Sequence, residues 1–191
     1  MIRKLFKAFI FRICSLIHCS TVKFFHPKAF YFCLEEMITV STHFVIRDNG
    51  KITLGKRCGM RRACEVSVAE NGVITIGNDV FFNKGCVIAA HNNIVIGDAT
   101  RFGPNVMVYD HDYDYKNLES QKRSQHICSP VIIGNNVWLG AGVTILRGSV
   151  IGDNCVIGAG CVIKGNYPAN SIVVQKRDEF VQTIQRRREE T

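Results

Sequence analysis

The sequence predicts an all-β fold, a parallel β-helix in which each coil carries three short strands. Fifteen apolar positions among its 191 residues are spaced in sixes, and glycine directly follows eight of them. Three sixes make one turn of a triangular coil, and stacked coils bury a continuous apolar column that a single coil could not bury. The fifteen positions are Leu54, Met60, Val66, Ile76, Phe82, Ile88, Ile96, Phe102, Val108, Ile133, Leu139, Ile145, Ile151, Ile157 and Ile163.

The insertions between coils support the same fold. Residues in excess of three sixes fall in 67–75, 89–95 and 109–132, always after the third strand of a coil. All the loops therefore leave from one edge of the prism. Insertions gathered on one edge of a repeat protein usually build its binding face.

A second repeated position lies four residues after an apolar marker and takes small side chains. Free cysteine behaves as a small hydrophobe, so the sequence predicts buried thiols there, which fit a reducing cytoplasm. No CxxC pair occurs, so these cysteines do not predict a zinc site. The cysteines at this position are Cys58, Cys64, Cys86, Cys155 and Cys161.

The chain divides into an N-terminal helical segment (1–36), a β-helix (37–174) with a long loop (109–132), and a C-terminal helix or tail (175–191). Apolar residues in 2–17 follow the spacing of an amphipathic helix, flanked by Arg and Lys. This helix either covers the open edge of the first coil or lies on an anionic membrane surface.

The N-terminal sequence predicts where the protein resides, and the distribution of charge argues against nucleic acid as a partner. Arg12 interrupts the apolar N-terminal run and no signal peptide is evident, so we expect a cytoplasmic protein, with peripheral contact at the inner face of the membrane as an option. Much of the net charge of +8 lies at the ends, including 186–188 in an expected helix from Asp178. No aromatic platform accompanies this charge, which favours a solvated face over a nucleic-acid site.

The stretch from Val131 to Pro168, "VIIGNNVWLGAGVTILRGSVIGDNCVIGAGCVIKGNYP", resembles the hexapeptide-repeat acyltransferases. Within that family it is similar to the galactoside, maltose and capsular-sugar O-acetyltransferases, and the resemblance covers residues 52–170. It implies a left-handed β-helix and a homotrimer with active sites between subunits. It also implies acetyl-CoA as acyl donor, and we expect no metal.

The family places its catalytic histidine at the start of the long loop, which here reads "VYDHDYDY" and so implies His111 as general base. A sugar hydroxyl is a poor nucleophile near neutral pH, and imidazole has a pKa suited to removing its proton. Asp110, Asp112 or Asp114 would orient the ring, and the sequence leaves that choice open. His126, at the far end of the loop, is the alternative base.

The resemblance implies that Asn83 contacts the acceptor and stabilises the tetrahedral intermediate; the alternative is an asparagine chosen for a turn. Where the family has an aspartate as its next acceptor contact, this chain has His91. His91 and His111 leave the same edge of successive coils, about 4.8 Å apart, so we expect them to face one substrate. With Lys84 nearby, His91 favours an acidic or phosphate-linked glycan over a simple galactoside.

The acetyl-CoA site is implied along the later coils. Trp138 should project outward, as a wall of the acyl or CoA site or as a trimer contact. The family's AGxPA segment is absent, and in its place Lys176 and Arg177 are expected to meet the nucleotide phosphates. The other implied contacts are Ala141, Ala159, Lys164 and Gly165.

The leading hypothesis is acetyl transfer from acetyl-CoA to a hydroxyl of a cell-surface polysaccharide or its precursor. Acetylation of serine, an amino sugar or an antibiotic shares the implied fold. A carbonic anhydrase-like protein would bind zinc through three histidines, and His91, His111 and His126 are just enough ligands. A scaffold without catalysis is the remaining alternative.

Overall fold

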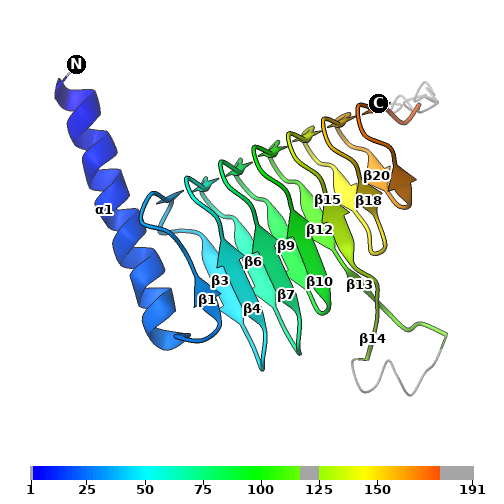
Figure 1. The fold of residues 1–191 in the computed structure, drawn as a ribbon, viewed down its shortest axis with the longest axis horizontal. Helices are drawn as coiled ribbons and strands as arrows, with labels where there is room; N and C mark the ends of the chain where they lie inside the picture. Colours follow the sequence, from blue (N-terminus) through cyan, green and yellow to red (C-terminus); the bar gives the residue numbers. More distant parts are fainter. Residues whose placement is uncertain (1, 117–124, 177–191) are drawn as a thin grey trace, which may run out of the picture.

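The strands form the three sides of a prism in the computed structural model, which describes residues 2–116 and 125–176 (Figure 1). In these ranges sheets A and B have seven parallel strands each and sheet C has six. The chain passes from A to B to C and back to A, one coil at a time.

The strand bounds are as follows. Sheet A contains β1 (Phe30–Tyr31), β4 (Lys51–Leu54), β7 (Val73–Ile76), β10 (Asn93–Ile96), β15 (Val131–Ile133), β18 (Val150–Ile151) and β21 (Asn166–Tyr167). Sheet B contains β2 (Met37–Ile38), β5 (Gly59–Met60), β8 (Phe81–Phe82), β11 (Arg101–Phe102), β16 (Trp138–Leu139), β19 (Val156–Ile157) and β22 (Ile172–Val173). Sheet C contains β3 (His43–Ile46), β6 (Glu65–Val68), β9 (Val87–Ala90), β12 (Met107–Tyr109), β17 (Thr144–Ile145) and β20 (Val162–Ile163).

The fifteen apolar markers form the core of the prism, as the spacing predicts. None is more than 2% exposed. Parallel pairing aligns equivalent positions of successive coils, so Phe82 lies beside Phe102 with ring centroids 4.3 Å apart. The five cysteines of the small-residue position are buried, and all nine cysteines, which lie in the described ranges, are free thiols.

The β-helix begins earlier than the expected boundary at residue 37. Strand β1 already pairs with β4, and Ile38 and Phe44 align in register with Met60 and Val66, two markers of the next coil. The start of this coil was missed because it lacks the residues that mark the later coils. Cys33 stands where most coils have glycine, and Glu36 occupies the small-residue position that Cys58 fills one coil later.

Helix α1 (Ile2–Phe25) extends well beyond the expected end at Ile17 and lies against the first coil (Figure 1). The extension is explained by packing, because Cys19 is fully buried and Val22 packs on the core. Ser15 is also buried, and its Oγ accepts a hydrogen bond from Ile38 N at 2.8 Å. The helix therefore covers the first coil.

The strongly apolar stripe of α1 faces away from the coil. Its residues are exposed: Phe6, Phe9, Ile10, Ile13, Leu16 and Ile17. Within the described residues, no helix is long and apolar enough to span a bilayer. The expected C-terminal helix lies outside the described residues, as do Arg177 and the 186–188 arginines.

Candidate active site

The turns from sheet C to sheet A form the edge of the prism that carries the insertions. We call it the insertion edge, and its described residues are 69–72, 91–92, 110–116 and 125–130. The long loop contributes a hairpin here, in which β13 (His111–Tyr113) pairs antiparallel with β14 (His126–Cys128). His126 lies opposite Tyr113 in this hairpin, and His91 occupies the turn between β9 and β10. The long loop therefore folds back and returns His126 to the edge that carries His91 and His111.

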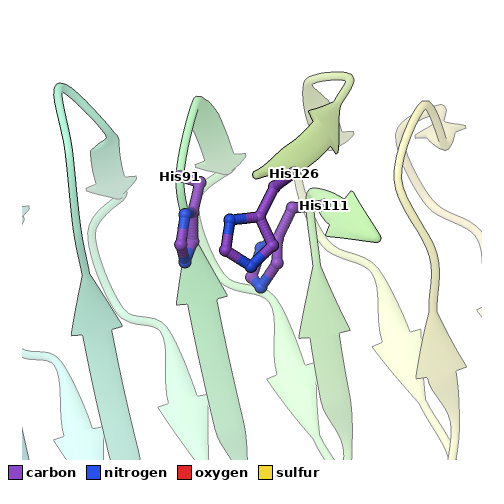
Figure 2. Close-up of side chains that lie close together, drawn as sticks. All are labelled: His91, His111 and His126. Carbon is purple, nitrogen blue, oxygen red and sulfur yellow. The ribbon is translucent and has the colours of Figure 1, made fainter. Parts of the chain in front are cut away.

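The three histidines form one cluster (Figure 2). The ring centroid of His91 lies 4.0 Å from that of His111 and 4.1 Å from that of His126. The rings of His111 and His126 are 5.1 Å apart. The sequence expectation that His91 and His111 lie together is confirmed, and His126 joins them.

Asp110 is the aspartate that orients His111. Its side chain is fully buried, and its Oδ1 lies 3.0 Å from His111 Nδ1. The same carboxylate accepts hydrogen bonds from the backbone N–H groups of His91 and Asn92, both at 2.8 Å. Asp112 instead accepts a hydrogen bond from Arg147 Nε at 2.6 Å. Among the three candidate aspartates, Asp110 makes the contact with the imidazole.

The ionisation of Asp110 and the tautomer of His111 follow from the groups around them. Burial raises the pKa of Asp110, but hydrogen bonds from His111 and from the backbone of His91 and Asn92 outweigh it, so the net pKa lies below the ordinary value. An ionised carboxylate only accepts hydrogen bonds, so His111 Nδ1 must carry the proton. In the neutral ring, Nε2 then carries the lone pair that a general base requires.

Glu70 is a member of the site that sequence reasoning missed. Its Oε1 lies 3.1 Å from His91 Nδ1 and 3.6 Å from His126 Nδ1. Burial lowers the pKa of His126, and the charges of His91 and His111 lower it further, against an opposing effect of Glu70. Glu70 lies on the insertion edge one coil before His91, so alignment of the coils could have revealed it.

Asn83 lies at a different edge, in the turn from sheet B to sheet C. Its Oδ1 accepts a hydrogen bond from Lys84 N at 2.9 Å, which leaves the amide N–H₂ group as a donor. Both residues line a cavity of 820 Å³, which Phe11 of α1 and Phe81 also line. The arginine and lysine residues of this cavity are Arg57, Arg61, Arg62, Lys84 and Arg101.

The residues expected to contact CoA divide between two edges. Trp138 projects outward from sheet B, 58% exposed, and Ala141 and Ala159 are exposed in the turns from sheet B to sheet C. Lys164 and Gly165 follow β20 and lie at the turn from sheet C to sheet A. One chain therefore does not gather them into one site.

Comparisons with known proteins agree with the repeat pattern. Residues 130–165 match the family model described as bacterial transferase hexapeptide (six repeats). A putative lipopolysaccharide biosynthesis O-acetyl transferase, WbbJ of Escherichia coli K12, is 30% identical over 44% of this chain and 47% of its own length. The galactoside O-acetyltransferase of the same organism is 32% identical over 41% of this chain and 38% of its own length. The chain thus spans about half or less of the length of these relatives.

The fold is also found among solved structures. A point mutant of AntD, an N-acyltransferase from Bacillus cereus, superposes with a TM-score of 0.62 at 21% identity, over 72% of this chain and 75% of AntD. That likeness confirms the expected left-handed parallel β-helix. Together with the family model, it confirms the resemblance to the hexapeptide-repeat acyltransferases.

Proposed function

We propose that this protein transfers an acetyl group from acetyl-CoA to a hydroxyl of a saccharide, with His111 as general base. The contact between His111 and the buried, ionised Asp110 carries the proposal. A fixed carboxylate on Nδ1 holds the ring in the tautomer whose Nε2 can accept a proton. The side chain of His111 is 16% exposed, so its ring is held within the site but still accessible to a substrate.

The reaction moves one proton through His111. Nε2 takes the proton of the acceptor hydroxyl as the oxygen attacks the thioester carbonyl carbon, which forms a tetrahedral intermediate. The carbon–sulfur bond then breaks, and the imidazolium returns the proton to the CoA sulfur. Asp110 stabilises the imidazolium between these steps without taking the proton itself. The amide N–H₂ group of Asn83 is suited to stabilise the developing oxyanion.

Asn83 and His111 lie at different edges of one prism, so this mechanism needs a second copy of the chain. A homotrimer would place the Asn83 edge of one subunit against the His111 edge of the next. It would also unite Trp138, Ala141 and Ala159 with Lys164 and Gly165 in a shared CoA site. The small side chains at 141 and 159 leave room for the pantetheine arm beside the backbone.

The charge around Asn83 supports an acidic or phosphate-linked glycan as acceptor. Arg61, Arg62, Lys84 and Arg101 line the cavity beside it, whereas Arg57 is already paired with Asp79 at the Oδ1 atom, 2.6 Å away. Guanidinium groups bind carboxylates and phosphates in bidentate geometry. Two relatives are described as O-acetyltransferases, which supports hydroxyl acceptors. AntD is described as an N-acyltransferase, in a complex with coenzyme A and a dTDP-amino sugar.

The test is release of CoA from acetyl-CoA in the presence of matched acceptors. Each neutral sugar is paired with its phosphorylated form and with its amino analogue, and products are identified by mass and by the alkali lability of esters. We expect esters, formed fastest on the phosphorylated hydroxyl sugars. If amides are the dominant product, the acetyl group is transferred to nitrogen and not to a hydroxyl. If CoA release does not depend on any acceptor, the proposal is overturned.

A further inference from the structure

The strongest unexplained feature of the molecule is the packing of three imidazoles at the insertion edge. A single base needs one histidine, yet three come from separate segments and converge (Figure 2). One ring nitrogen of each lies within 4.8 Å of the others. We propose that His91, His111 and His126 form a binding site for a divalent transition metal ion such as Zn²⁺, and that a bound ion blocks His111.

The carboxylates around the cluster fit such a site. Glu70 Oε1 faces the Nδ1 atoms of His91 and His126, and Asp110 Oδ1 faces that of His111. Histidines that bind metals almost always donate their second ring N–H to a carboxylate or carbonyl, which fixes the tautomer and strengthens the ligand. The negative charges of two carboxylates also balance the charge of a divalent cation held by three imidazoles.

His126 provides an independent indication. Its side chain is only 9% exposed, and its buried Nδ1 lies 3.6 Å from Glu70 Oε1, too far for a hydrogen bond, with no other hydrogen-bond partner among the described residues. A buried polar atom without a partner is costly, and a metal ion at the cluster would draw this ring into a defined geometry.

The geometry requires a small closure. Tetrahedral zinc with bonds of about 2.0–2.1 Å holds its nitrogen ligands about 3.4 Å apart. Separations of up to 4.8 Å must therefore shrink by about 1.5 Å at most, which rotation of the side chains can supply. Three nitrogen ligands and no thiolate suit zinc, cobalt, nickel or copper and leave one position for water.

Metal binding and base catalysis exclude each other at this site. The lone pair that would accept the hydroxyl proton is the lone pair of His111 that would hold the ion. A bound ion is therefore an inhibitor of the proposed transfer, and its removal restores the base.

The experiment measures metal binding directly, on the full chain stripped with a chelator. Zn²⁺ is titrated against a chromophoric chelator, and Co²⁺ is titrated while its visible d–d absorption reports the coordination geometry. We expect one ion per chain with an apparent dissociation constant of about 1 µM or below. His91→Ala, His111→Ala and His126→Ala should each weaken binding by about 100-fold, and Glu70→Gln by about 10-fold or more.

The matched control is His43→Ala, which removes an exposed histidine of β3 outside the cluster and should leave metal binding unchanged. Circular dichroism confirms that each variant is folded before titration. Absence of binding to the wild type below millimolar metal overturns the proposal. So does binding that survives all three cluster substitutions, or that is lost in His43→Ala.

Discussion

Two edges of the prism use the same contact for different purposes. The edge between sheets A and B, which we call the ladder edge, contains residues 55–58, 77–80, 97–100, 134–137 and 152–155. Here a side-chain oxygen of one coil accepts a hydrogen bond from a backbone N–H of the preceding coil. Asn78 Oδ1 accepts from Lys56 N at 2.9 Å, and Asp98 Oδ1 accepts from Asn78 N at 2.7 Å. Asn135 and Asp153 continue the series. These contacts hold neighbouring coils in register.

At the insertion edge Asp110 makes the same contact but adds a second one. Its carboxylate accepts the N–H groups of His91 and Asn92 from the preceding coil, and it also faces His111. Asp110 is fully buried, whereas the ladder-edge contacts are exposed. The contact that serves stacking at the ladder edge thus also holds, when it is buried beside His111, the imidazole that we propose as the general base.

The largest expected effect separates chemistry from stability. His111→Ala should lower acetyl transfer by about 10² to 10⁴, the usual contribution of a positioned general base, while acetyl-CoA binding and the melting temperature stay close to wild type. The measurement is kcat/KM with the best acceptor, beside acetyl-CoA affinity by calorimetry. Near-normal turnover would transfer the role to His126.

A buried carboxyl group in the first coil, Glu36, should make stability depend on pH. Glu36 is 3% exposed, and burial raises its pKa to about 7 from 4.5. The folded state therefore holds a proton that the unfolded state releases between these values, so stability falls as pH rises through that window. The loss reaches about 3 kcal/mol, and Glu36→Gln should abolish it. Urea unfolding at pH 5 and pH 8 measures the unfolding free energy of the wild type and of Glu36→Gln. An equal change in unfolding free energy between the two pH values in both proteins would contradict this role of Glu36.

Glycine at the ladder edge should be required for stacking and not for catalysis. A Cβ on Gly97 would lie 2.6 Å from the carbonyl carbon of Gly134 in the next coil. Gly97→Ala should therefore cost about 1–3 kcal/mol of unfolding free energy and leave kcat unchanged. Gly158→Ala is the control, because its Cβ would first meet the Val174 side chain at 3.3 Å. Equal losses in the two variants would argue against close backbone stacking as the cause.

The smallest effect concerns α1, which has one face toward the first coil and one away from it. Ser15→Ala leaves Ile38 N–H without its acceptor and should lower the free energy of unfolding by about 1–2 kcal/mol without altering membrane association.

We propose that the outward stripe binds anionic membranes, so a Phe9→Ser, Ile13→Ser double variant should lose binding to anionic vesicles at unchanged stability. Cosedimentation and thermal melts measure both, and vesicle binding retained by the double variant would exclude the stripe.

The repeat made the fold predictable because each coil obeys one spacing rule, and parallel pairing places equivalent residues in contact. Counting residues along the repeat was therefore enough to predict that positions such as Phe82 and Phe102 lie in the core on successive coils. The start of the first coil was not predicted because Cys33 and Glu36 replace the residues that mark later coils. The site was predicted only in part, since insertions break the spacing. The return of His126, the choice of Asp110 and the contacts of Glu70 depend on how the long loop folds back.

The most direct test of the account compares two aspartates that make the same backbone contact. Asp110→Asn and Asp98→Asn are each measured for kcat/KM and for unfolding free energy. We predict that Asp110→Asn lowers kcat/KM by about 10- to 100-fold, because the amide no longer fixes the tautomer of His111, and that Asp98→Asn leaves kcat/KM at the wild-type value. Equal kcat/KM for the two variants would contradict the proposed role of the insertion edge.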